Sequence, residues 1–94
     1  MNISVEELLN LSNPKIIDIR MNENYNKGHI PGSINIAYNN LLMNPSKYLK
    51  KGENYYIYCN HGRTSKGLCS VLNSLGYHVY SINGGYESWA ARNI

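Results

Sequence analysis

Short apolar runs alternate along the chain with polar segments in which apolar residues recur at helical spacing. The runs are rich in β-branched and aromatic residues, a composition typical of strands buried in a parallel sheet. We therefore expect four strands, at positions 15–19, 33–37, 55–59 and 77–82. A further edge strand is expected around Ile3.

The first helix is predicted by a capping-box pattern, in which Ser4 and Glu7 can each satisfy the other's backbone amide. Asn13-Pro14 should end the helical region, because proline disfavours a helical residue before it. The apolar face expected for this helix consists of Val5, Leu8, Leu9 and Leu11.

Further helices are expected at about 21–27, 38–43, 45–50, 64–75 and 86–92. The longest of them carries four apolar residues at helical spacing, which should lie on the sheet. These residues are Leu68, Cys69, Leu72 and Leu75. Gly76 suits the left-handed position that commonly closes a helix.

Strands that alternate with helices build βαβ units, whose crossovers place helices on both faces of a parallel sheet. We therefore predict an α/β fold with a central, mostly parallel sheet of four to five strands and helices on both faces. At 94 residues the chain has room for one domain, 1–94. A chain of this size buries roughly 60–65% of its unfolded surface, so the fold needs neither disulfides nor a metal ion.

The charge of the chain is mild. Nine Lys and Arg residues against six Asp and Glu leave a formal net charge of +3, without the dense basic stripe of a nucleic-acid surface. No apolar run approaches the ~18 residues of a membrane span, and no basic-then-apolar leader follows Met1. We expect a cytoplasmic protein that binds neither nucleic acid nor membrane.

The two cysteines lie in different settings. Cys69 falls on the apolar face of a helix and should be a core residue, and the chain has no Cys-x-x-Cys motif for a redox pair or a zinc ribbon. Cys59 ends a strand just before a Gly-containing turn and a helix. The amides of such a turn point at whatever anion lies there, which gives Cys59 a physical reason to be a thiolate. The alternative is a small, buried core cysteine.

Three separated stretches match the pattern of a known family. They are Ile17-Asp-Ile-Arg20 with Glu23 and Tyr25, Gly28-His-Ile-Pro-Gly-Ser33 leading into 34–36, and Cys59-x-x-Gly62-x-Thr64-Ser65 with Gly84-Gly85 and Trp89 downstream. In this order and at these spacings the sequence resembles the single-domain rhodaneses, or thiosulfate sulfurtransferases, over nearly its whole length. The fold of that family, a parallel sheet flanked by helices, agrees with the α/β prediction.

The resemblance implies that Cys59 is the catalytic nucleophile. The family cysteine accepts the outer sulfur of thiosulfate or another persulfide donor and passes it to a thiophilic acceptor, such as cyanide, a thiol or a protein thiol. No metal or organic cofactor takes part. A free thiol, with a pKa of about 8.5, is mostly protonated at neutral pH. The main-chain amides from Asn60 to Ser65 would favour the thiolate and hold the terminal sulfur of the persulfide.

The loop predicted to surround the nucleophile consists of Asn60, His61, Gly62, Arg63, Thr64 and Ser65. Arg63 is best placed to receive a thiosulfate or sulfite oxygen, although many family loops carry their arginine one residue later, at the position of Thr64. Thr64 and Ser65 are expected to cap the helix with their hydroxyls. His61 is expected to be an ordinary surface residue.

Structural roles are expected for four residues outside the loop. Asp18 should accept hydrogen bonds from loop amides, and Arg20 should pair with Glu23, so that both support the loop. His29 should fix its own turn by hydrogen bonding. Trp89 should lie in the core.

Two other functions are considered for the same residues. A sulfur-carrier or docking module would use this loop between protein partners and would act on thiosulfate only incidentally. Certain dual-specificity phosphatases share the family fold, but their signature is Cys-x5-Arg. Here the sixth residue after Cys59 is Ser65, and Arg63 comes too early. Phosphatase activity is therefore disfavoured.

Overall fold

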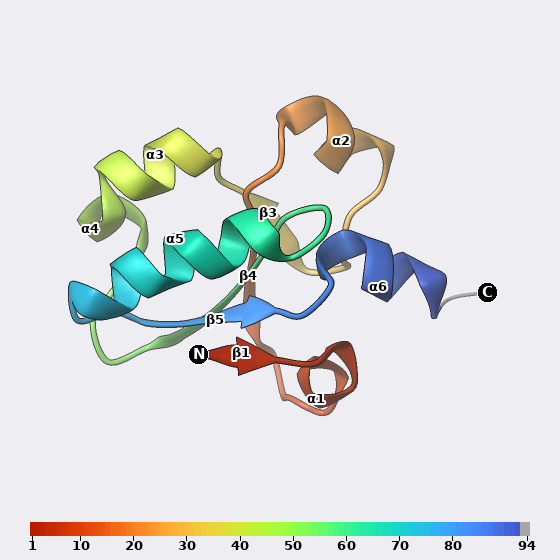
Figure 1. Cartoon of the computed structure of the whole chain (residues 1–94), viewed down its shortest axis with the longest axis horizontal. Coiled ribbons are helices and arrows are strands. Elements are labelled where there is room, and N and C mark those ends of the chain that lie inside the picture. The colour runs from red at the N-terminus through yellow and green to blue at the C-terminus, as the bar shows by residue number, and fades with distance from the viewer. Residues whose placement is uncertain (93–94) are drawn as a thin grey trace.

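The computed structural model describes residues 1–92, and the last two positions of the predicted domain, 93–94, lie outside the described residues. Within residues 1–92, five strands form one sheet in the order β1-β5-β4-β2-β3, and every neighbouring pair is parallel. The strands are β1 (Asn2–Ile3), β2 (Lys15–Asp18), β3 (Ser33–Asn35), β4 (Asn54–Tyr58) and β5 (His78–Ile82). The predicted parallel α/β fold is confirmed (Figure 1).

Six helices connect or follow these strands in the described part of the chain. They are α1 (Val5–Leu9), α2 (Asn22–Lys27), α3 (Tyr38–Met43), α4 (Pro45–Tyr48), α5 (Arg63–Ser74) and α6 (Gly85–Ala91). Among the described residues, none of the helices has both the length and the apolar character needed to cross a bilayer.

Helices cover both faces of the sheet. Alternate residues of β4 belong to two different buried clusters, with Tyr55 and Ile57 in one and Tyr56 and Tyr58 in the other. Because successive side chains of a strand point to opposite faces, the two clusters lie on opposite sides of the sheet. The first cluster includes apolar residues of α3 and α5, and the second includes residues of α1 with partly buried residues of α6.

The two central strands end side by side and position the loops that follow them. β2 and β4 pair in register, with Asp18 opposite Tyr58. Both strands therefore deliver the next residues to the same edge of the sheet, the carboxyl edge, where ligands bind in open α/β folds. β4 ends at Tyr58, one residue before the predicted end, so Cys59 lies just beyond the strand. α5 begins at Arg63, one residue before the predicted start.

Local signals at the element ends are confirmed in detail. The capping box of α1 forms, with the Glu7 amide donating to Ser4 Oγ and the Ser4 amide donating to Glu7 Oε1, both at 3.0 Å. Gly76 adopts the expected left-handed conformation, with φ of 97°. His29 Nδ1 lies 2.8 Å from the carbonyl oxygen of Tyr25, which confirms its role in fixing the turn.

Some residues predicted for the apolar faces of α1 and α5 are exposed, so this part of the prediction is wrong. Leu9 and Leu11 are exposed, because α1 has only five residues and already covers the sheet with Val5 and Leu8. Leu75 is 50% exposed, because it lies at the C-cap of α5, where the chain turns away from the sheet. The other predicted residues of α5 are buried. Trp89 is only partly buried and packs against the second cluster.

Truncating a buried and an exposed leucine of α5 and its C-cap should have very different effects on stability. Leu72 is fully buried, so Leu72→Ala should lower the free energy of unfolding by about 2–5 kcal/mol. Leu75→Ala, its matched control, should change it by less than about 0.5 kcal/mol. Urea unfolding followed by circular dichroism measures both. Equal losses would show that α5 packs in another register.

Candidate active site

Cys59 lies at the floor of a cleft of about 520 Å³ at the carboxyl edge of the sheet. The cleft is lined from the β2 side by Ile19, Arg20, Met21 and Asn24, and from the β4 side by Cys59, Asn60, His61, Arg63 and Thr64. The side chain of Cys59 is 9% exposed and belongs to the core cluster beneath α5. The sequence left two alternatives for Cys59, a thiolate facing a turn and a buried core cysteine. The structure combines them, because Cys59 packs on the core and still borders the cleft.

The loop after Cys59 turns its backbone toward the sulfur. The amide of Gly62 lies 3.2 Å from Cys59 Sγ, and the amide of Ser65 lies 3.3 Å from it. Gly62 makes this turn with φ of 94°, a left-handed conformation that favours glycine. Of the amides predicted to converge between Asn60 and Ser65, these two and that of His61 act on the sulfur.

These contacts change the acidity of the thiol. Burial raises the pKa of Cys59, but hydrogen bonds from the Ser65 hydroxyl and from the amides of Ser65, Gly62 and His61 lower it by more. The net pKa of Cys59 lies below its ordinary value. Hydrogen bonds to an ionised group are about twice as strong as neutral ones, so neutral donors can hold a buried thiolate. The site therefore favours an anionic sulfur at the sheet edge.

Ser65 points inward rather than capping α5. The N-cap of α5 is Gly62, and no side chain caps this helix, so the predicted capping by Thr64 and Ser65 is wrong. Ser65 Oγ lies 3.5 Å from Cys59 Sγ and 2.8 Å from Ser81 Oγ. The sequence reasoning missed Ser81. A usable signal was present, because Ser65 shares the helical spacing of the buried leucines and Ser81 interrupts an apolar strand.

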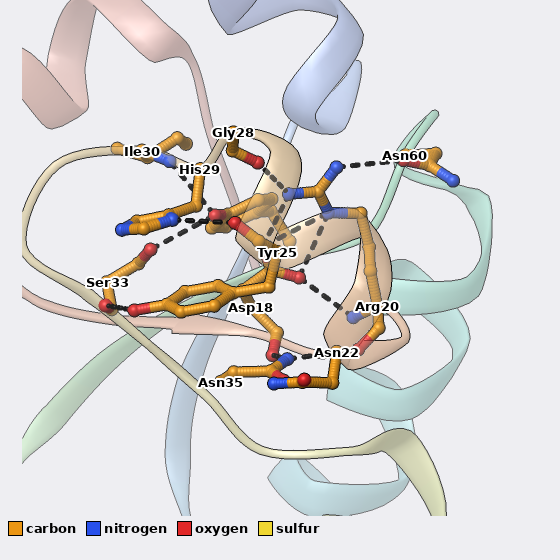
Figure 2. Close-up of polar contacts among 11 residues, drawn as sticks. Asp18, Arg20, Asn22, Tyr25, Gly28, His29, Ile30, Ser33, Asn35 and Asn60 are labelled. Atoms are coloured by element: carbon orange, nitrogen blue, oxygen red, sulfur yellow. Dashed lines mark hydrogen bonds and ion pairs between the residues drawn. The ribbon is translucent and has the colours of Figure 1, made fainter.

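Asp18 and Arg20 form a buried ion pair behind the loop (Figure 2). Arg20 Nη2 lies 2.7 Å from Asp18 Oδ2, and Nε donates to both carboxylate oxygens. Arg20 also donates to the carbonyl of Gly28 at 2.6 Å and to Asn60 Oδ1 at 3.3 Å. The predicted pairing of Arg20 with Glu23 is wrong, because Arg20 folds back over the end of β2 instead.

Aromatic rings complete the surroundings of Arg20. Its guanidinium carbon lies 5.6 Å from the ring centroid of Tyr58 and 4.2 Å from that of Tyr86, distances typical of cation–π contacts. Asp18 accepts the backbone amide of Arg20 rather than amides of the loop after Cys59, which corrects that expectation. The ion pair reaches the loop only through Asn60.

The amino end of α6 lies against the loop from the outside. The amide of Tyr86 donates to the carbonyl of Cys59 at 2.9 Å, and the amide of Glu87 donates to that of Asn60 at 3.0 Å. A Cβ atom on Gly85 would collide with the carbonyl of Cys59, so this approach requires glycine. The sequence predicted the helix at 86–92 and the Gly84-Gly85 pair, but not their contact with the loop after Cys59.

His61, Arg63 and Thr64 are exposed at the rim of the cleft. His61 Nδ1 lies 3.0 Å from Glu87 Oε2, but both side chains are largely in solvent. Exposed ion pairs of this kind contribute little to stability. Arg63 places an exposed cation at the rim, whereas the charge of Arg20 is neutralised by Asp18.

Cys69, unlike Cys59, lies wholly in the core. Burial raises its pKa to about 12, and both cysteines are free thiols. Among the described residues, no group of three or more histidine, cysteine, aspartate or glutamate side chains could hold a metal ion. The donors gathered in the cleft suit an anion instead.

Comparisons with known proteins agree with this geometry. The family model described as Rhodanese-like domain matches residues 3–92. A relative from Tolumonas auensis, named thiosulfate sulfurtransferase GlpE, is 34% identical in an alignment 91 residues long that covers 93% of this chain and 85% of that protein. A relative from Ogataea parapolymorpha, named adenylyltransferase and sulfurtransferase uba4, is 33% identical over 94% of this chain and 23% of its own length.

The fold is also found in a solved structure. A rhodanese-related protein from Thermoplasma volcanium has a TM-score of 0.86 to this chain at 28% identity, covering 97% of this chain and 91% of that one. The likeness in sequence and in structure therefore extends over nearly the whole chain.

Removing Arg20 should destabilise the protein strongly. Arg20→Ala leaves the buried Asp18 carboxylate without its counterion and should lower the free energy of unfolding by about 3–5 kcal/mol. Arg20→Lys should lose less stability than Arg20→Ala but should remain less stable than the wild type, because one ammonium group cannot replace the forked guanidinium contacts. Arg92→Ala, which breaks an exposed pair with Glu6, should cost less than about 1 kcal/mol. Urea unfolding compares the three, and a cost for Arg20→Ala as small as that of Arg92→Ala would contradict this account.

The two thiols should react at different pH. Iodoacetamide should alkylate Cys59 with a midpoint below the ordinary thiol pKa of about 8.5, because the loop donors stabilise its thiolate. Cys69 should stay unmodified in the folded protein, since burial raises its pKa to about 12. Peptide mass spectrometry after labelling at increasing pH measures both. Labelling of Cys69 before Cys59 would contradict the assignment.

Proposed function

The chain belongs to the rhodanese-like domain family, and on that premise we propose that it is a sulfurtransferase in which Cys59 carries the sulfur as a persulfide. We propose further that residues 1–94 form a single rhodanese-like domain. The observation that carries the function is the convergence of the Gly62 and Ser65 amides on Cys59 Sγ beneath an open cleft. A sulfur nucleophile needs to be anionic and accessible at the same time, and this arrangement supports both requirements.

The proposed reaction has two balanced steps. In the first, the Cys59 thiolate attacks the outer sulfur of thiosulfate, a new S–S bond forms, and the S–S bond of thiosulfate breaks with its electron pair leaving on sulfite. In the second, an acceptor such as cyanide attacks the outer sulfur of the persulfide, forming thiocyanate and returning the electron pair to Cys59. No proton transfer or external oxidant is needed.

The loop donors support both steps of this scheme. In the first step Cys59 is the nucleophile, and the amides of Gly62 and Ser65 favour its ionised form. In the second step Cys59 is the leaving group, and the same donors stabilise the charge that returns to it. Because the donors are already in place around the sulfur, little reorganisation is required as the charge moves.

Thiosulfate is the small-molecule donor that the site supports best. The dianion would enter the cleft with its outer sulfur toward Cys59 and its sulfonate oxygens toward the rim, where the Arg63 cation is exposed. Charge-assisted hydrogen bonds from Arg63 would orient it. The relative from Tolumonas auensis is itself named a thiosulfate sulfurtransferase.

A second candidate is a sulfur carrier that acts between protein partners. It is favoured by the likeness to the Ogataea parapolymorpha protein, whose name joins an adenylyltransferase to a sulfurtransferase and of which this chain would span only 23%. The cleft is open enough for a terminal sulfur to be presented to a protein thiol. This candidate uses the same Cys59 persulfide and differs in the donor and acceptor.

Phosphatase chemistry receives no support from the site. The sixth residue after Cys59, where the phosphatase signature requires arginine, is Ser65. Ser65 is fully buried and bonded to Ser81, so a long cationic side chain could not replace it without disrupting the core. Two amides bind the sulfur itself, which suits a single sulfur anion.

Thiocyanate release from thiosulfate and cyanide tests the proposal. The wild-type protein should turn over, and Cys59→Ser should lose the activity completely because no thiolate remains. Cys69→Ala is the matched control and should keep it, since Cys69 lies in the core away from the cleft. An active Cys59→Ser would exclude Cys59 as the nucleophile.

The same preparations distinguish the two candidates. Mass spectrometry after incubation with thiosulfate should show a gain of one sulfur atom that reductant removes, and only when Cys59 is present. Slow thiocyanate release combined with fast transfer from a persulfidated protein would favour the carrier.

A further inference from the structure

Ser81 lies beneath the active site without reaching the cleft. It is 2% exposed at the carboxyl end of β5, and Ser65 beside it is fully buried. Among the described residues, the hydroxyl of Ser81 has one hydrogen-bond partner, Ser65 Oγ at 2.8 Å. Ser65 in turn has two further partners, Cys59 Sγ at 3.5 Å and the carbonyl of Gly62 at 3.3 Å.

The number of available protons determines which of the two hydroxyls, Ser65 or Ser81, donates to the other. A hydroxyl has one proton to donate and two lone pairs that accept. A buried Ser81 proton without an acceptor would be costly, and the acceptor within reach is Ser65 Oγ. Ser81 therefore donates to Ser65. The Ser65 proton must then go either to Cys59 Sγ or to the Gly62 carbonyl.

We propose that Ser81 is a positioning residue for the sulfur-transfer reaction, because its buried hydroxyl donates to Ser65 and leaves the Ser65 proton free to bind the anionic sulfur of Cys59. When Cys59 is ionised, the Ser65 proton binds sulfur, because a hydrogen bond to an ion is the stronger choice. The chain from Ser81 through Ser65 to Cys59 is then a hydroxyl relay in which each bond polarises the next.

The relay has a second state for the persulfide. Once Cys59 carries an outer sulfur, the negative charge moves away from Sγ to that sulfur. The Ser65 proton can then turn to the Gly62 carbonyl, which lies close enough to accept it, while Ser81 continues to donate to Ser65. When the acceptor removes the outer sulfur, charge returns to Sγ and the Ser65 proton returns with it. Ser81 thus assists Cys59 both as nucleophile and as leaving group.

The role in sulfur transfer rests on the proposed function, but the effect on Cys59 does not. We expect Ser81→Ala to raise the pKa of Cys59 by about 0.1–0.3 unit, since one hydrogen bond strengthens its neighbour by roughly 10–30% and the Ser65 bond is worth about one unit. Ser65→Ala, which removes the direct donor, should raise it by about one unit. Ser81 does not touch the cleft, so in the transfer assay Ser81→Ala should lower kcat and leave KM for thiosulfate unchanged.

The experiment is the pH profile of Cys59 alkylation by iodoacetamide in the folded protein, which does not depend on sulfurtransferase activity. Ser81→Ala should move the profile to higher pH and keep the high-pH rate within about twofold, because ionisation changes and access does not. Ser33→Ala is the matched control, since Ser33 is also a buried strand serine but bonds Tyr58 instead. An unmoved profile in Ser81→Ala, or an equal shift in Ser33→Ala, overturns the proposal.

A double-mutant cycle separates the relay from general loosening of the core. In a Ser65→Ala background, Ser81→Ala should add no further shift to the pKa of Cys59, because the link between Ser81 and the sulfur is already lost. Additive shifts overturn the proposal. If the profiles behave as expected and no thiocyanate is formed, the relay stands and the proposed function fails.

Discussion

A negative charge on sulfur, held at the end of a strand by neutral donors, is the constraint on which the rest of this structure depends. Within residues 1–92, the hydrogen bonds that favour a Cys59 thiolate come from neutral groups, among them the Gly62 and Ser65 amides and the Ser65 hydroxyl. Such donors are effective only if they stay aimed at the sulfur. A short loop has little internal structure to aim them, so the surrounding elements must fix its backbone.

Each surrounding element holds part of this loop in place. α6 donates two amides to loop carbonyls, and its glycine allows the close approach. The ion pair after β2 reaches the loop at Asn60 and holds the neighbouring turn at Gly28. β5 supplies Ser81 beneath Ser65. The parallel order of the sheet places these contributions together, because β2, β4 and β5 all end at the same edge. The charge of Arg20 is used within the scaffold, whereas the cation of Arg63 is exposed at the rim of the cleft.

The fold could be predicted from the sequence because its signals are local. Periodicity, a capping box and turn glycines each act over a few residues, and the predicted strands and helices follow from them. The position of Cys59 was predictable for the same reason. What failed depends on contacts between distant segments. Helix-like spacing favours Glu23 as the partner of Arg20, yet Arg20 folds onto Asp18 and is covered there by the ring of Tyr86 from α6, a segment distant in sequence. The capping expected of Ser65 failed because α5 starts earlier, at a left-handed glycine, and turns the hydroxyl toward β5.

The convergence of donors on one sulfur also links the chemistry of Cys59 to the folding equilibrium. These donors lower the pKa of Cys59 in the folded protein relative to the unfolded chain, where the thiol has its ordinary value. By thermodynamic linkage, ionisation of Cys59 then stabilises the fold at pH values above the unfolded pKa, and this contribution is lost as the pH falls through the folded pKa. Ionisation of Cys59 and folding of the domain are therefore coupled, and each favours the other.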